Sequence, residues 1–236
     1  MKKLLIINPN SSEAMTGDIR ETVSYANDSE FSLEVVSTPG SPDVLESFAD
    51  YTQAGAQVIS YLRRRRAESD FDYDGVLLAC MGDPCLYGIK EACPVPLIGI
   101  AEAGISTALL TGYKFSILAS SAKAKPMMES MVMTYGLLDR MASVETLSVP
   151  IESFMKDPNV LRDGIRRTAD AALAKGAEVL LLGCAGMTML SRELDTLAKI
   201  PVIDPIKAGV EQLKALVRGG FAVSRAGLYA PGVQDA

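Results

Sequence analysis

Short runs of valine, isoleucine and leucine alternate along the chain with longer stretches in which apolar residues recur at helical spacing. The short runs have the composition of buried strands, and the longer stretches have the periodicity of amphipathic helices. We expect strands over residues 3–7, 31–37, 75–79, 97–100, 115–119, 143–148, 179–183 and 202–203. We expect helices over residues 11–26, 44–65, 85–91, 103–110, 124–135, 160–175, 188–198 and 206–217. Strands that alternate with helices predict an α/β fold with parallel sheets.

An internal repeat predicts that this fold has two halves of similar topology. Three pairs of segments correspond at a nearly constant spacing, namely residues 3–12 with 114–121, 74–82 with 177–186, and 95–104 with 200–209. We expect a first half of residues 1–98 plus 206–236 and a second half of residues 99–205, because the last helix echoes the crossover near residue 101. Ligands of parallel α/β sheets bind beyond the carboxyl ends of the strands, so we expect the site in the cleft between the halves.

Cys80 and Cys184 occupy equivalent places in the repeat, each directly after a buried strand and just before a helix. Asp83 is predicted to cap the helix that follows Cys80, with Pro84 as its first residue. Nearby helix N-termini are expected to lower the pKa of each thiol from about 8.5 toward neutrality, which makes a thiolate a usable base. If the halves face each other, one thiolate can remove a proton from a carbon while the opposite thiol delivers a proton to the other face.

The alternative for either cysteine is a small packing residue, since free cysteine is common in protein cores. The equivalent strand ends, each with a glycine close by, favour a functional role. Cys85 and Cys93 have no partners in the repeat, so we expect both to be packing residues, although Cys85 is placed where it could line the mouth of the cleft.

Polar residues follow the first strand of each half. Asn10 and Ser11 come after the first strand of the chain, and Ser120 and Ser121 hold the matching place in the second half. We expect these side chains to contact the substrate. Helix capping is the alternative role at both places. In the first half, Asn10 and Glu13 have the spacing of a capping box.

Glycines close to both cysteines give backbone amides access to the site. Gly82, Gly183 and Gly186 would let amides approach a developing enolate oxygen, which is the electrostatic help that proton abstraction next to a carbonyl needs. Glu102 and Asp204 lie at equivalent strand ends, where we expect a boundary or hydrogen-bonding role rather than direct chemistry.

The composition narrows the chemistry. The 236 residues include no histidine, which excludes Ser-His-Asp and Cys-His catalysis, HExxH zinc sites and imidazole as an acid or base. A net charge of -6 argues against a nucleic-acid partner, and four cysteines without a CxxC pair argue against a metal site. The apolar run near the N-terminus is too short for a signal peptide, and no apolar stretch is long enough to span a bilayer. We therefore expect a cytoplasmic protein with reduced thiols and no membrane partner.

Four stretches, taken in order, resemble the aspartate/glutamate racemase superfamily, and especially its hydantoin and allantoin racemase branch. They are residues 7–12 (INPNSS), 79–84 (ACMGDP), 99–103 (GIAEA) and 182–187 (LGCAGM). The resemblance implies two Rossmann-like domains in pseudo-twofold relation, with racemisation by Cys80 and Cys184 in the cleft between them and no cofactor. It also implies a homo-oligomer, a dimer or larger. Substrate contacts are implied for loop amides and side chains at Asn10, Ser11, Met81, Gly82, Ser120, Ser121, Ala185 and Gly186.

Departures from other branches of this superfamily indicate the substrate. Glutamate racemases carry an acidic residue after the first strand, Asn-Thr after the first cysteine and commonly a histidine after the second. The corresponding places here are residues 8–10 (NPN), Met81-Gly82 and Ala185-Gly186. A free α-ammonium group would lack its acidic partner, so a neutral cyclic ureide suits the site better. We expect a small-molecule substrate, a 5-substituted hydantoin or allantoin.

Two other functions stay open at this point. Enzymes of the maleate isomerase type also keep two cysteines, and they would use a thiol as a nucleophile that adds to a double bond. A non-catalytic sensor could instead close its two halves over a small anion. Arylmalonate decarboxylase-like members lack the first thiol, so the presence of Cys80 argues against that reaction.

Overall fold

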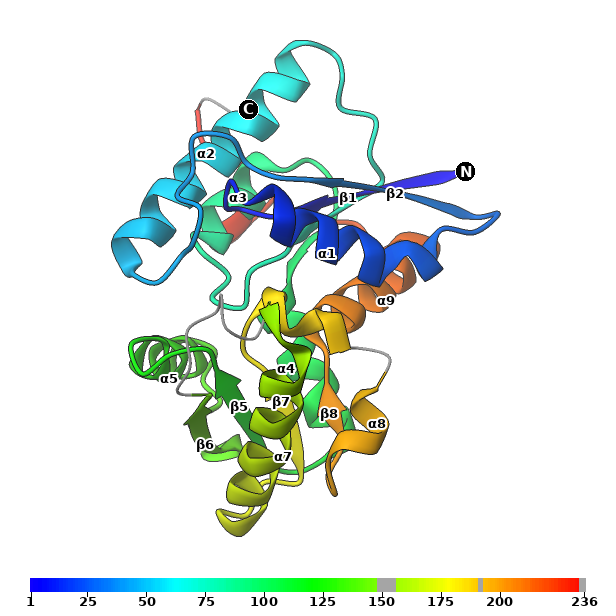
Figure 1. The fold of residues 1–236 in the computed structure, drawn as a ribbon. Coiled ribbons are helices and arrows are strands. Elements are labelled where there is room, and N and C mark those ends of the chain that lie inside the picture. The colour runs from blue at the N-terminus through cyan, green and yellow to red at the C-terminus, as the bar shows by residue number, and fades with distance from the viewer. Residues whose placement is uncertain (148–155, 191–192, 234–236) are drawn as a thin grey trace.

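The computed structural model describes residues 1–147, 156–190 and 193–233, and these residues form two parallel β-sheets covered by helices (Figure 1). The strand order of the first sheet is β2 (Phe31–Val36), β1 (Lys2–Ile7), β3 (Gly75–Leu78) and β4 (Leu97–Gly99). The order of the second sheet is β6 (Met141–Thr146), β5 (Phe115–Ala119), β7 (Val179–Leu182) and β8 (Val202–Ile203). The strand pairs of both sheets are parallel. The predicted α/β fold with two halves of similar topology is therefore confirmed.

Helices connect these strands in chain order. The α-helices are α1 (Glu13–Val23), α2 (Phe48–Ala67), α3 (Leu86–Ala92), α4 (Ile100–Thr111), α5 (Ala124–Thr134), α7 (Pro158–Ala174), α8 (Leu194–Leu197) and α9 (Pro205–Arg218). Short 3₁₀ segments lie at η1 (Ser24–Ala26), η2 (Leu138–Arg140), η3 (Ala185–Leu190) and η4 (Gly227–Tyr229). Within the described ranges, none of the helices combines the length and apolar character that crossing a membrane requires.

The central strands are buried on both faces. All residues of β3, β5 and β7 are buried, and so are the last four residues of β1. In β1, Leu4 and Ile6 pack in one cluster with residues of α1, whereas Leu5 and Ile7 pack in another with residues of α2. Helices therefore shield both faces of the sheet from water, which explains why these strands read as continuous apolar runs.

Helices α4 and α9 each follow a strand of one sheet and pack on the other sheet. α4 follows β4 but contacts β5 and β7, whereas α9 follows β8 and contacts β3 and β4. A side chain at Gly104 of α4 would come within 2.7 Å of Leu181, and one at Gly209 of α9 would come within 2.6 Å of Leu77. The repeated glycine thus lets each helix lie close to its strand. The division of the chain into domains at residues 98/99 and 205/206 stays a prediction.

Several predicted elements have other bounds in the structure; the helix predicted over residues 44–65, for example, begins at Phe48. The predicted helix over residues 188–198 is the 3₁₀ segment η3 followed by the short helix α8, and residues 191–192 lie outside the described part. The predicted strand over residues 143–148 begins earlier, at Met141, and residue 148 is likewise outside the described part. The predicted helix over residues 103–110 begins at Ile100, directly after β4, because a carboxylate from another segment caps its N-terminus.

Candidate active site

A cavity of about 50 Å³ lies between the two halves, where β1, β3, β5 and β7 end. We call it the thiol cavity. It is also lined by Met15 of α1, Tyr51 of α2 and Met128 of α5, which the sequence analysis did not single out. The residues that were predicted for the site and that line this cavity are Asn10, Cys80, Met81, Gly82, Ser120, Cys184 and Ala185.

The two thiols occupy equivalent positions on the cavity. Cys80 follows β3 and Cys184 follows β7, and each keeps part of its surface accessible. In both cases the backbone N–H of the glycine two residues further on, Gly82 or Gly186, donates a hydrogen bond to the sulfur. A hydrogen bond to the charged form favours that form. Each half therefore has a donor that can hold a thiolate.

Burial nevertheless dominates the electrostatics of both thiols. Burial raises the pKa of Cys80 to about 12, and burial also raises the pKa of Cys184. For Cys80 the hydrogen bond from Gly82 opposes this rise, whereas negative charge on Cys184 adds to it. The predicted lowering of both pKa values toward neutrality is therefore wrong, because desolvation outweighs the N–H donors. Both thiols are protonated near pH 7.

Tyr51 is a residue of the site that sequence reasoning missed. Its hydroxyl donates a hydrogen bond to the sulfur of Cys80, and burial raises the pKa of the tyrosine well above its usual range. Gly82 lies against this hydroxyl, since a side chain at Gly82 would collide with the ring and oxygen of Tyr51. The apolar pattern of residues 44–65 predicted a helix but not which of its faces meets the other half of the protein. That information comes from tertiary packing.

Asp83 does not cap the helix that follows Cys80, so that prediction is wrong. Helix α3 begins two residues after Pro84, and its N-cap residue is Cys85 in a left-handed conformation, with φ of 54°. The carboxylate of Asp83 instead accepts hydrogen bonds from the backbone N–H groups of Ala101 at 3.0 Å and Glu102 at 2.9 Å. Asp83 therefore caps α4, at the start of the second half.

The equivalent position of the repeat shows why α4 takes its cap from the loop after Cys80. There Asp204 caps α9 directly, accepting a hydrogen bond from the N–H of Ile206 at 2.8 Å and another from the hydroxyl of Thr188 at 2.5 Å. The repeat aligns Asp204 with Gly99, which has no side chain. A side chain at Gly99 would collide with the Asp83 carboxylate. Asp83 thus supplies to α4 the carboxylate that Asp204 supplies to α9.

The hydrogen-bonding role expected for Glu102 and Asp204 is what the structure shows. Glu102 accepts hydrogen bonds from Lys90 at 2.6 Å and from the N–H of Gly99 at 3.2 Å. Neither carboxylate lines the thiol cavity.

Asn10 lines the thiol cavity and does not cap α1. Its side-chain oxygen accepts hydrogen bonds from the side chain of Asn8 at 2.7 Å and from the N–H of Ser12 at 3.0 Å. Ser12 is the cap, and its hydroxyl accepts a hydrogen bond from the N–H of Met15 at 3.3 Å. The capping box of Asn10 with Glu13 is therefore wrong, and the amide of Asn10 is held in one orientation at the cavity.

The predicted serines divide into two groups. Ser120 is buried and lines the cavity. Ser11 and Ser121 do not line it, because the Ser11 hydroxyl donates to Asp43 and the Ser121 hydroxyl accepts a hydrogen bond of 3.2 Å from the N–H of Ala124. Ser121 thus binds the N–H of the first residue of α5, although the N-cap residue of that helix is Lys123.

The remaining cysteines differ from each other. Cys93 is buried in the apolar cluster of the first sheet, and its thiol lies 3.5 Å from the carbonyl oxygen of Val95, as expected for a packing residue. Cys85 is exposed, so it is not a buried packing residue, although its side chain contacts Gly55 of α2. It lines a larger cavity next to the thiol cavity, as the alternative expected for it suggested. Its left-handed conformation turns the chain sharply into α3.

Two parallel sheets of the same strand order, with a thiol at an equivalent strand end of each, are consistent with a two-domain racemase fold. The profile of the Asp/Glu/Hydantoin racemase family matches residues 4–213. The chain therefore belongs to this family.

The chain is also similar to individual members of this family. The chain is 30% identical over 228 residues to a hydantoin racemase of Paenarthrobacter aurescens, a match that covers 96% of each chain. It is 31% identical to a hydantoin racemase of Pseudomonas sp. (strain NS671), with 96% of this chain and 90% of the relative covered. Its structure is similar to that of an allantoin racemase from Klebsiella pneumoniae, with a TM-score of 0.88, 28% identity, and 98% and 94% of the two chains covered.

Proposed function

We propose that this chain is a cofactor-independent racemase that inverts the C5 stereocentre of a hydantoin-type cyclic ureide, a 5-substituted hydantoin or allantoin. The observation that carries the proposal is the placement of Cys80 and Cys184 at equivalent strand ends on one cavity. The similarity to hydantoin racemases and to an allantoin racemase supports this substrate class.

Each turnover removes one proton from C5 and adds one proton to its opposite face. One cysteine first releases its proton to solvent, and its thiolate then takes the C5 proton. The electron pair of the C–H bond moves into the neighbouring carbonyl to give an enolate. The thiol of the other cysteine gives its proton to C5 as the enolate collapses, so that a thiolate now stands on the second side. Protons and charge balance, and the next turnover runs in the reverse direction.

The enolate needs help beyond the two thiols. A positioned acid or base contributes about 10²–10⁴-fold, and preorganised donors at the developing oxyanion contribute a comparable share. Asn10 and Ser120 offer side-chain donors at the cavity, and the loops through Met81 and Ala185 bring their backbone to it. These groups would bind the ring carbonyls and the imide N–H.

The two-base mechanism is tested by proton exchange. Each enantiomer of a 5-substituted hydantoin is incubated with the enzyme in D₂O, and optical activity and deuterium incorporation at C5 are followed together. Cys80→Ser and Cys184→Ser should each lower racemisation by at least about 10²-fold and retain C5 exchange in no more than one enantiomer.

Cys93→Ala is the matched control, because Cys93 is a buried cysteine away from the cavity and its loss should leave kcat/KM unchanged in folded protein. Full racemase activity in either Cys80→Ser or Cys184→Ser contradicts the proposal. A covalent adduct between one thiol and an unsaturated diacid would instead support the maleate isomerase alternative.

A further inference from the structure

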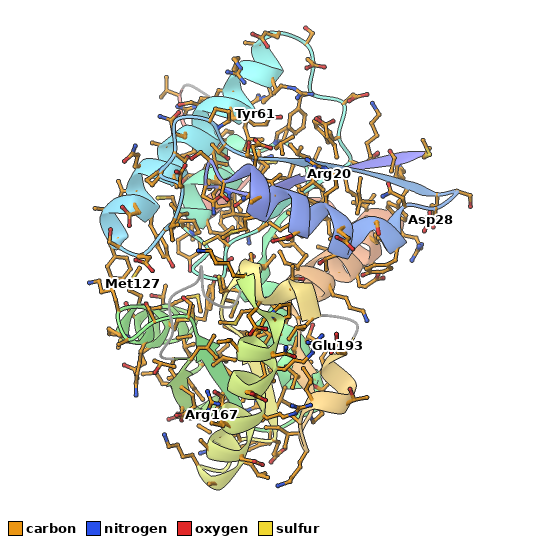
Figure 2. All side chains as sticks on the ribbon, in the orientation of Figure 1. Arg20, Asp28, Tyr61, Met127, Arg167 and Glu193 are labelled. Carbon is orange, nitrogen blue, oxygen red and sulfur yellow. The ribbon has the colours of Figure 1, made fainter. Side chains whose placement is uncertain are left out.

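A second and larger cavity adjoins the thiol cavity. Its volume is about 360 Å³, and it lies between the beginning of α2, the segment that leads into α3, and one face of α5. Phe48 and Leu86 form its wall on the first half, and Met127 and Met131 form its wall on the second. Met127, labelled in Figure 2, lies where α5 approaches the beginning of α2. We call this space the second cavity.

The two cavities share residues at one point. Tyr51 and Gly82 line both of them, and the Tyr51 hydroxyl is hydrogen-bonded to the sulfur of Cys80. Since Gly82 has no side chain, the ring of Tyr51 forms the partition between the two spaces. The second cavity is therefore the neighbouring space for a group attached to a carbon beside Cys80, with Tyr51 between that carbon and the space.

The walls of the second cavity suit an apolar group. Among the described residues that line it there is no lysine or arginine. The Asp83 carboxylate, which lies in the lining, is buried and already accepts hydrogen bonds from two backbone N–H groups and from the hydroxyl of Tyr135. The hydroxyls of Thr52 and Thr134 bond to backbone carbonyls of their own helices, at 2.8 and 3.0 Å.

A polar and an apolar 5-substituent would differ in the hydrogen bonds that they lose on entering the second cavity. The ureido group of allantoin carries N–H donors and a carbonyl acceptor. At this wall it would meet the hydroxyls of Ser130 and Tyr87, but the other polar side chains, those of Asp83, Thr52 and Thr134, are already engaged, so part of its hydrogen bonding would be lost. An aromatic or branched aliphatic group loses no hydrogen bonds on entry and gains from the burial of its apolar surface. Phe48 and Tyr87, which are 56% and 38% exposed, would be covered by such a group.

We propose that the second cavity receives the 5-substituent of the substrate and selects an uncharged aromatic or branched aliphatic substituent over the ureido group of allantoin. This inference rests on the proposed racemase function and names the substrate class within it. Tyr51 is then a specificity-determining residue, because its ring stands between the reacting carbon and the cavity that receives the substituent.

The test compares three substrates with the whole enzyme, after subtraction of the uncatalysed rate. We expect kcat/KM for 5-benzylhydantoin to exceed that for 5-methylhydantoin and for allantoin by at least about tenfold, which is the discrimination that a fitted apolar pocket provides. Equal or higher kcat/KM for allantoin would overturn the inference and leave the racemase function intact. Absence of C5 exchange with all three substrates would overturn the racemase function itself, and the inference with it.

Two tryptophan variants on α5 locate the effect. Ser130 lines the second cavity, whereas Met133 is 60% exposed on the same helix and does not line it. Ser130→Trp should lower kcat/KM for 5-benzylhydantoin by at least about tenfold and change that for 5-methylhydantoin by no more than about twofold. Met133→Trp should change neither. Equal losses for both substrates with Ser130→Trp, or no loss for either, would overturn the inference.

Discussion

The hydroxyl of Tyr135 donates a hydrogen bond of 2.7 Å to the carboxylate of Asp83, and this bond joins the loop after Cys80 to the end of α5 in the other half. The same carboxylate caps α4, so three segments meet at one buried group. A loop anchored in this way keeps the sulfur of Cys80 in a fixed place on the cavity. Asp83 therefore ties the loop after Cys80 to α4 and to the end of α5.

Tyr135→Phe removes this bond and keeps the aromatic ring. A buried carboxylate then has one donor fewer, so we expect the free energy of unfolding to fall by about 1–3 kcal/mol. Urea unfolding at pH 7.5 measures the loss. Tyr113→Phe is the matched control, because Tyr113 is 63% exposed and its change should stay within about 0.5 kcal/mol. Similar losses in both variants would show that the bridge contributes nothing to stability.

Asp83→Asn tests the electrostatics of the same group. Burial raises the pKa of Asp83 to about 7, while the hydrogen bond from Tyr135 opposes the rise and the charge of Glu102 adds to it. In the unfolded chain an aspartate has a pKa of about 3.9. Between these values the folded protein holds a proton that the unfolded chain has released. The contribution of Asp83 to stability is thus fully present below about pH 4 and is lost as the pH rises through about 7.

The amide introduced by Asp83→Asn keeps an oxygen that can accept the N–H groups of α4 but does not titrate. The stability of the variant relative to the wild type should therefore increase between pH 5 and pH 8, by on the order of 3 kcal/mol. Urea unfolding of both proteins at the two pH values gives this difference, and other titrating groups cancel in it. A difference that does not change with pH would contradict the raised pKa of Asp83.

The candidate site was predictable where its chemistry depends on local sequence. Cys80 and Cys184 each end a continuous apolar run and are followed by a glycine two residues on, and this pattern repeats along the chain. Asn10 and Ser120 follow strands in the same way, so the topology of each parallel sheet places two of the four residues at its carboxyl edge.

Long-range contacts were the part that could not be predicted. The sequence of Asp83-Pro84 is typical of a helix cap, yet the carboxylate finds its donors in α4 and in Tyr135, far along the chain. Tyr51 sits in a predicted helix, but the docking of that helix against the second half decides that its hydroxyl reaches Cys80. The thiol pKa values were mispredicted for a related reason, since desolvation depends on residues from both halves.

The raised thiol pKa values predict an order of chemical reactivity. Thiolates are the reactive form, so a thiol whose pKa desolvation raises to about 12 reacts slowly at neutral pH, even where part of its surface is accessible. Iodoacetamide at pH 7.5 should modify the exposed Cys85 at least about tenfold faster than Cys80, and the rate at Cys80 should rise by about tenfold per pH unit from pH 7.5 to 9.5. Peptide mass spectrometry follows each site. Faster modification of Cys80 than of Cys85 at pH 7.5 would contradict the raised pKa of Cys80.

Tyr51→Phe should slow the chemistry without disturbing the fold. The Tyr51 hydroxyl donates to the Cys80 sulfur and lowers the pKa of that thiol, so its loss leaves less thiolate near neutral pH. We expect kcat/KM to fall by about tenfold at pH 7, and the rise of kcat/KM with pH to shift to higher pH, because one hydrogen bond to a charged group is lost. The two enantiomers have equal free energy, so the fall must be the same in both directions. Tyr25→Phe, at a half-exposed tyrosine that does not line the cavity, should leave the pH profile unchanged, and an unshifted profile in Tyr51→Phe would remove Tyr51 from the proton-transfer machinery.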